Sequence, residues 1–163
     1  MIMLGWMVLE LTDSPWLVAL IGFFASAPLI ILGLIGGMLA DKLDRAKLLV
    51  FTQTITLIAT LGMGFLLVFE KQQYWHAYIV SAIIGAGWAI DNPARRLLIL
   101  DLVGRRWVTN GVALDSVGMQ MSRMAGPAVG GGLIALIGLT GGYVFASLSQ
   151  ITAVVVLLIL NMK

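Results

Sequence analysis

Two long apolar runs separated by one short charged turn constrain the fold of this chain more than any other feature. The runs extend from Pro15 to Leu39 and from Leu48 to Phe69, and each could cross a bilayer as a helix at about 1.5 Å per residue. The turn between them, residues 40–47, holds two acids and three bases. Because charges are costly in hydrocarbon, this pattern predicts a helical hairpin that turns at the membrane surface.

The composition places the whole chain in the membrane. Of its 163 residues, 60% are hydrophobic and only 11% are charged, and the mean hydropathy is +1.02, outside the range of soluble domains. The net charge is +2, but the bases form no continuous face with interleaved aromatic residues, which argues against nucleic-acid binding. The chain has no cysteine, which excludes disulfides and thiolate chemistry.

We therefore predict an all-α, polytopic membrane protein with about five full transmembrane helices and the second half of a first one. Residues 1–12 span only about 18 Å as a helix, short of a hydrocarbon core of about 30 Å, so the chain is expected to be truncated at its start. The predicted helices cover residues 1–12, 15–40, 45–69, 74–94, 111–137 and 143–160. Residues 101–110 are expected to form a basic surface segment, and residues 138–142 a glycine turn.

The distribution of bases predicts the orientation of these helices. Eight of the ten bases are expected on one side of the membrane: Lys42, Arg45, Lys47, Arg95, Arg96, Arg105, Arg106 and Lys163. Only Lys71 lies on the other side. By the positive-inside rule, the 41–47 turn is expected to be cytoplasmic.

Arg123 is the strongest single candidate for a functional residue. A charge near the middle of a membrane helix costs at least about 2.5 kcal/mol on insertion scales, so it should face a wet cavity or an acidic partner. Asp115 lies about 12 Å away along the same helix, too far for direct pairing. Both a cavity role and a structural ion pair remain open for Arg123, as do a cavity and an interfacial role for Glu10.

Small residues recur along the segment that holds Arg123. Gly118, Ser122, Gly126 and Gly130 are spaced by four, which forms a shallow groove where another helix can pack closely. Pro127 lies inside this groove and is expected to bend the helix. The alternative interpretation of the groove is generic packing of small residues.

Enzymatic chemistry has no support in this sequence. There is no phosphate-binding Gly-x-x-x-x-Gly-Lys-Ser/Thr loop, and the single histidine has neither a second metal ligand nor a nucleophile near it. We predict no catalytic residue, no metal site and no cofactor.

The residues of the charged turn resemble a known signature. Gly37, Asp41, Lys42 and Arg45 are similar to the loop between the second and third helices of the major facilitator superfamily of transporters, although Asp44 stands where that family often has glycine. Gly126, Pro127, Gly130 and Gly131 resemble the glycine-proline motif in the fifth helix of its exporters. In order along the chain, these motifs resemble the bacterial exporter subgroup that includes the enterobactin exporter and macrolide efflux proteins.

The resemblance implies specific roles for the charged residues. Arg45 is expected to pair with Asp91, and Asp41 to meet a helix start in a second half of the transporter. The alternative for Asp91 is a solvated acid beside Arg95 and Arg96. Gly37 is expected to allow close approach of another backbone. A cytoplasmic gate would be formed by Gly37, Asp41, Lys42, Arg45 and Asp91, while Arg123 and Glu10 would serve a substrate or proton cavity.

The implied function is ion-gradient-driven export of a small organic molecule, of the drug or siderophore class, by alternating access. The chain would be the amino-terminal half of such a transporter in a bacterial inner membrane. Its expected partners are lipid, substrate, the missing carboxy-terminal half and a coupling ion, which the resemblance implies is a proton. The alternatives are a truncated half that only packs in the membrane, a self-associating half-transporter, and uptake instead of export.

Overall fold

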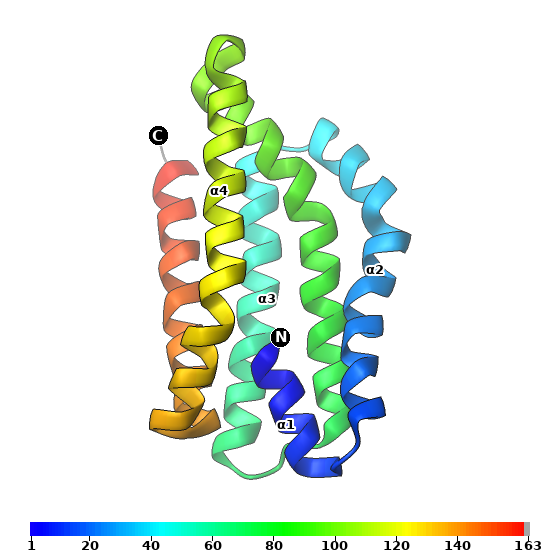
Figure 1. Ribbon diagram of the computed structural model, residues 1–163. Helices are drawn as coiled ribbons and strands as arrows, with labels where there is room; N and C mark the ends of the chain where they lie inside the picture. Colours follow the sequence, from blue (N-terminus) through cyan, green and yellow to red (C-terminus); the bar gives the residue numbers. More distant parts are fainter. Residues whose placement is uncertain (162–163) are drawn as a thin grey trace.

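The computed structural model describes residues 1–161, and four helices account for nearly all of them (Figure 1). They are α1 (Ile2–Thr12), α2 (Pro15–Lys42), α3 (Arg45–Val68) and α4 (Tyr74–Asn161). Lys163, which we expected on the basic side of the membrane, lies outside the described residues. The predicted all-α class is confirmed, since residues 1–161 contain no strand.

Helix α4 is not one straight rod, because its backbone leaves the helical region at two glycines. Gly104 has φ 72° and ψ 169°, and Gly138 has φ 71° and ψ 176°. Both φ values are readily accessible only to glycine. The chain reverses direction at both positions (Figure 1), so α4 consists of three antiparallel segments: 74–103, 105–137 and 139–161.

These reversals correct the predicted helix boundaries. Three continuous helices are long and apolar enough to cross a membrane, Pro15–Lys42, Arg45–Val68 and the greater part of α4. Because α4 is divided at Gly104 and Gly138, the described residues contain five long helical segments beside the short α1, and the expected helices differ from these in where they begin and end. The helix expected to end near Ala94 continues through Pro93 to residue 103. The basic segment 101–110 is a helical tip interrupted only at Gly104, and the turn expected over 138–142 is confined to Gly138.

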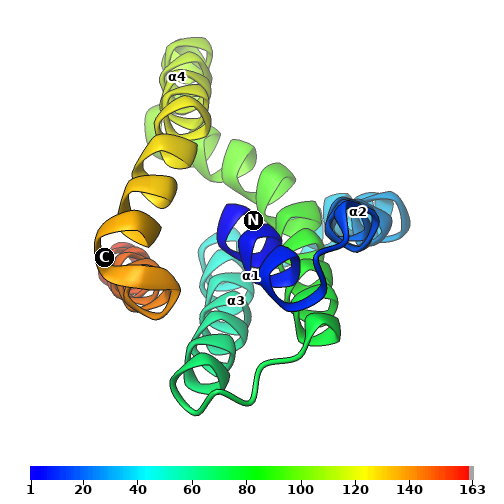
Figure 2. The ribbon, with the colours of Figure 1, turned by 60° about the horizontal axis from the view of Figure 1, so that its bottom comes forward.

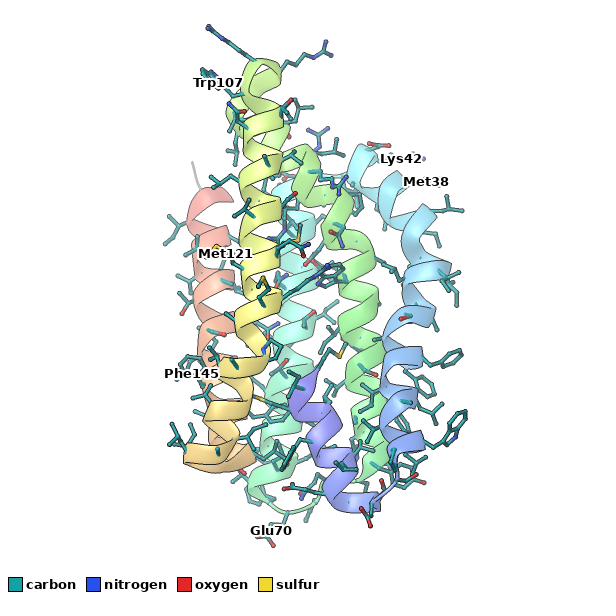
Figure 3. The ribbon with its side chains drawn as sticks, viewed as in Figure 1. Met38, Lys42, Glu70, Trp107, Met121 and Phe145 are labelled. Carbon is teal, nitrogen blue, oxygen red and sulfur yellow. The ribbon has the colours of Figure 1, made fainter. Side chains whose placement is uncertain are left out.

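Apolar side chains cover the outside of the bundle, as expected for a protein surrounded by lipid. On α2, Ile30 is 81% exposed and Leu34 is 84% exposed, and on the 105–137 segment Met124 reaches 82%. In Figure 3, Met38 and Phe145 also project outward from their helices. Exposed apolar surface on this scale is disfavoured in water and suits a hydrocarbon environment.

Two apolar clusters hold the helices together at opposite ends of the bundle. The larger cluster buries Leu4, Met7 and Val8 of α1 against α2, α3 and α4, and Figure 2 shows α1 beside these helices. The smaller cluster joins Ala40, Leu48, Leu49 and Ala94. Asp91, Thr52 and Gln53, described below, lie between these two clusters.

The two basic turns lie at the same end of the bundle. Lys42 and Trp107 mark that end in Figure 3, and Glu70 lies at the opposite end. This arrangement confirms that the 41–47 turn and the 104–107 tip share one side. We expected Arg95 and Arg96 in one turn with Arg105 and Arg106. They lie instead inside the 74–103 segment, about 13 Å from Gly104 along the helix axis.

Candidate functional site

Asp91 is a buried carboxylate held by neutral donors from α3. Its side chain is 7% exposed, and it accepts hydrogen bonds from the Thr52 hydroxyl and the Gln53 amide. Thr52 and Gln53 are adjacent in sequence, and both reach Asp91 because α3 packs closely on the 74–103 segment. The polar pair in α3 therefore joins two helices through one acid.

The predicted pair between Arg45 and Asp91 is wrong. Arg45 forms its ion pair with Asp101, near the Gly104 reversal. The reason is geometric: Asp91 lies ten residues before Asp101 in a continuous helix, about 15 Å nearer the middle of the bundle. Arg45 at the start of α3 therefore meets the later acid.

A double-mutant cycle tests this correction. We expect a coupling energy of about 0.5 kcal/mol between Arg45 and Asp101, because their side chains are 28% and 48% exposed and exposed pairs are weak. Between Arg45 and Asp91 the coupling should be close to zero. The measurement is thermal unfolding in detergent for Arg45→Ala, Asp101→Ala, Asp91→Ala and the two double variants. Stronger coupling of Arg45 to Asp91 than to Asp101 would contradict the observed pairing.

The remaining residues of the charged turn lie at the exposed end of α2. Asp41 and Lys42 are both exposed, and neither forms an ion pair within residues 1–161. Asp44 caps α3 by accepting hydrogen bonds from the backbone amides of Ala46 and Lys47, at 3.1 and 3.2 Å. The bond from Lys47 is the main reason that the pKa of the Asp44 carboxyl is lowered. The N-cap role of Asp44 thus explains why an acid stands at the position where the signature often has glycine.

Arg95 and Asp115 form an ion pair that we did not predict from the sequence. The Arg95 Nη1 atom lies 3.7 Å from the Asp115 Oδ1 atom, which links segments 74–103 and 105–137. The two residues lie nine and eleven positions from Gly104, so the reversal there brings them opposite each other. A helical hairpin centred on Gly104 would have predicted the pair, whereas we placed residues 101–110 in a surface segment.

The same hairpin brings Arg123 to Trp88. The Arg123 guanidinium carbon lies 5.2 Å from the centroid of the Trp88 ring, a cation–π contact. Arg123 has no ion pair or hydrogen bond to any side chain in the described part of the chain. The structure contains no acidic partner for Arg123 within residues 1–161. Of the two interpretations left open for Arg123, this observation speaks against the structural ion pair.

Three adjoining cavities surround these charged groups. One of about 430 Å³ is lined by Trp88, Arg95, Asp115 and Arg123, together with Gly118, Met119 and Ser122. A smaller one of about 140 Å³ reaches Asp91 and Gln53. An open groove of about 520 Å³ continues toward the 139–161 segment, past Ser149 and Thr152. Arg95 lines all three, so the cavity that holds Arg123 adjoins the one that holds Asp91.

Glu10 lies apart from this cluster. It is exposed near the end of α1 and accepts a hydrogen bond of 2.6 Å from the Trp6 indole. That end of α1 faces the same end of the bundle as Glu70, whereas Met121, two residues before Arg123, lies midway along its helix (Figures 1 and 3). The structure therefore does not bring Glu10 and Arg123 together.

The close approach expected at Gly37 occurs one residue earlier. A Cβ atom added to Gly36 would lie 2.5 Å from the Ala89 carbonyl oxygen, whereas one added to Gly37 would meet no atom within 4 Å. Gly85 packs still more tightly against the Ala25 carbonyl. Glycines on both α2 and α4 thus bring these helices into backbone contact, a feature of both helices that Gly37 alone did not reveal.

The glycine-proline motif lies on an open face of the 105–137 segment. Cβ atoms added to Gly126, Gly130 or Gly131 would meet nothing within 4 Å, and the same holds for Gly118. The helix stays continuous through Pro127. No helix in the described residues packs into the predicted groove at these glycines.

Taken with the lipid-length helices, a polar cluster inside the bundle defines this chain as a multi-pass α-helical membrane protein. Comparison with known proteins gives its family. Residues 1–163 match the protein family described as transmembrane secretion effector. The chain belongs to this family of the major facilitator superfamily of transporters, which confirms the resemblance seen in the sequence.

Two curated bacterial relatives are similar to the chain. An uncharacterized MFS-type transporter, YfiS of Bacillus subtilis (strain 168), is 26% identical over 128 residues, which cover 77% of this chain and 29% of the relative. The staphyloferrin A transporter of Staphylococcus aureus (strain NCTC 8325 / PS 47) is 24% identical over 161 residues, covering 98% and 41%. The chain thus spans less than half the length of either relative. No solved structure matches it.

Proposed function

We propose that this chain forms the amino-terminal half of a secondary active exporter of small organic molecules. The observation that carries the proposal is the cavity of about 430 Å³ lined by two arginines and a tryptophan on membrane-spanning helices. Charged groups at membrane depth are costly and serve transport pathways in most cases. Membership of a transporter family supports the same function.

A second half would complete the transport path. The matches cover only 29% and 41% of the relatives' lengths, and transporters of this class alternate access by rocking two halves around a midplane site. The open glycine face of Gly126, Gly130 and Gly131 offers a surface for such a half. Following the family's exporters, the Gly126–Pro127 motif favours export over uptake.

The charged turn would act as the cytoplasmic gate of a bacterial inner-membrane protein. Lys42, Arg45 and Arg105 lie toward one end of the bundle, and by the positive-inside rule that end faces the cytoplasm. Arg45 bonded to Asp101 ties α3 to α4 at this end. Asp41 forms no ion pair in the described residues, and a Cβ atom added to Gly37 would meet no atom within 4 Å. These two residues would meet the second half. Asp91 would act deeper, below the gate.

The substrate would be of the drug or siderophore class, with a proton as the coupling ion. A relative named as a staphyloferrin A transporter supports a small organic substrate. No nucleotide-binding loop of the Gly-x-x-x-x-Gly-Lys-Ser/Thr type occurs in the sequence, so an ion gradient is the proposed energy source. Glu10 remains a candidate for proton uptake from the opposite side of the membrane.

Transport into inverted membrane vesicles tests the proposal. With this chain and the second half expressed together, substrate accumulation should need a proton gradient and stop when an uncoupler is added. Arg123→Ala is expected to lower the transport rate about tenfold or more, which corresponds to loss of a charge-assisted contact of about 1.4 kcal/mol. Unchanged transport by Arg123→Ala would remove Arg123 from the path.

The same vesicles distinguish the alternatives. The 163-residue chain alone should accumulate no substrate, because it supplies only one wall of the cavity. Transport by the chain alone, together with a crosslinked dimer, would instead support a self-associating half-transporter. Accumulation in intact cells rather than resistance would support uptake. No transport in any combination would support a packing role only.

A further inference from the structure

The geometry points to an organic anion with a flat ring system as the ligand of the Trp88–Arg123 cavity. This inference rests on the proposed transport function and names the chemical class of its substrate. The cavity is lined by residues of one helical hairpin, segments 74–103 and 105–137, so this chain alone carries the groups that would recognise the ligand.

The balance of charges in the cavity favours an anion. Its lining holds two guanidinium groups, Arg95 and Arg123, and one carboxylate, Asp115. Asp115 lies 3.7 Å from Arg95, which leaves Arg123 without a countercharge in residues 1–161. Asp91, in the adjoining small cavity, already accepts hydrogen bonds from Thr52 and Gln53. A bound carboxylate would supply the missing charge.

The hydrogen-bonding groups point the same way. A guanidinium carries five N–H donors in a planar fork that matches a carboxylate, and those of Arg123 bond to no group in the part of the chain described. The Ser122 hydroxyl already donates to the Gly118 carbonyl at 2.9 Å. The cavity therefore offers unused donors, and its ligand should be rich in acceptors.

The walls favour a flat ring beside the charge. Trp88 is 43% exposed, and the guanidinium of Arg123 lies over its ring. Met119, on the 105–137 segment, also lines the cavity. A methionine thioether is a favourable neighbour for an aromatic ring. A volume of about 430 Å³ lies within the usual range of about 300–1,000 Å³ for ligand sites.

Two dyes that share a three-ring core test the class of ligand. Fluorescein is an anion with a free carboxylate at neutral pH, and rhodamine B ethyl ester is a cation without one. Binding of each dye to the 163-residue chain in lipid nanodiscs would be measured by dye fluorescence polarisation. We expect fluorescein to bind more tightly than the ester, and Arg123→Gln to weaken fluorescein binding about tenfold or more.

The chain contains a matched control for Arg123. Arg106 lies over the Trp107 ring at 5.5 Å, so it is also an arginine stacked on a tryptophan, but it lies on the exposed tip. Arg106→Gln removes the same charge and should leave fluorescein binding unchanged. Arg123→Lys, which keeps the charge, and Trp88→Leu, which removes the ring, should each weaken binding by less than Arg123→Gln, and they remain informative if that variant does not fold.

Two results would overturn the inference: binding of the ester as tight as that of fluorescein, or equal effects of Arg106→Gln and Arg123→Gln. The vesicle experiment separates this failure from failure of the proposed function. Export of the cationic ester without fluorescein binding overturns the anion preference and leaves the exporter in place. Fluorescein binding through Arg123 without export supports the anion site and overturns the exporter.

Discussion

Gly36→Ala is expected to lower the thermal stability of the protein, whereas the same change at Gly37, one residue later, should leave stability unchanged or raise it. At Gly36 the new Cβ would lie 2.5 Å from the Ala89 carbonyl oxygen and 3.1 Å from the Ile90 Cα atom. These are backbone atoms and cannot rotate away, so α2 and α4 would have to separate.

The magnitudes decide the sign at each position. Overpacking a tight contact costs about 1–3 kcal/mol, and replacing a helical glycine with alanine gains up to about 1 kcal/mol. At Gly36 the overlap outweighs the gain. At Gly37, with no atom within 4 Å of the new Cβ, only the gain remains.

The measurement is the midpoint of heat-induced aggregation in detergent, followed by size-exclusion chromatography. Gly85→Ala serves as a second test at the other close contact. It should lower the midpoint, as Gly36→Ala does, because its Cβ would overlap the Ala25 carbonyl oxygen. Equal midpoints for the Gly36 and Gly37 variants would show that α2 and α4 do not meet as described. Gly37→Ala should still reduce transport if the second half packs against Gly37.

Arg95→Ala is the second change with a large expected effect, and its neighbour Arg96 is the control. Arg95 is paired with Asp115 and lines the small cavity that also holds Asp91. Removing it leaves Asp115 without its ion-pair partner at membrane depth. Arg96 is exposed and forms no ion pair with any described residue.

We expect Arg95→Ala to destabilise the protein by about 1–3 kcal/mol, less than the ~3–5 kcal/mol of a fully buried pair, because the Arg95 side chain is 44% exposed. Transport by the complete protein should fall at least about tenfold if the cavity is the substrate path. Arg96→Ala should change neither quantity.

Two further variants separate charge from packing at this position. Arg95→Lys keeps the charge and should recover most of the stability, and Asp115→Asn in the Arg95→Ala background should relieve part of the loss because one uncompensated acid is gone. Equal losses for the alanine variants at 95 and 96 would mean that the ion pair with Asp115 does not matter.

The membrane-embedded fold could be predicted from the apolar runs, but the partners of the charged residues could not. The runs before and after the 40–47 turn specify helices because only internally bonded backbone is stable in lipid. For Arg45, by contrast, the sequence offers two possible acidic partners on one helix, Asp91 and Asp101. The choice of Asp101 over Asp91 depends on where that helix ends, and Pro93 suggested a wrong end.

The Arg95–Asp115 pair was missed for a related reason. The two residues lie twenty positions apart, and sequence distance along separate helices gives no sign that they meet. Gly104 was the available signal, because a single glycine with positive φ is enough to reverse a helix. Counting outward from Gly104 would have placed Arg95 level with residue 113, within one helical turn of Asp115.

From the sequence alone one could tell that this chain crosses the membrane as helices, that its basic turns share one end and that it belongs to a family of transporters. These properties depend on composition and on the order of apolar and charged residues along the chain, which determine which segments are stable in a bilayer. The packed fold was needed to show that Asp91 accepts hydrogen bonds from Thr52 and Gln53, that Arg123 lies over Trp88 and that Gly36, not Gly37, meets another helix. Such contacts depend on the rotation and register of one helix against another, and a shift of one residue turns a side chain by about 100° around the axis.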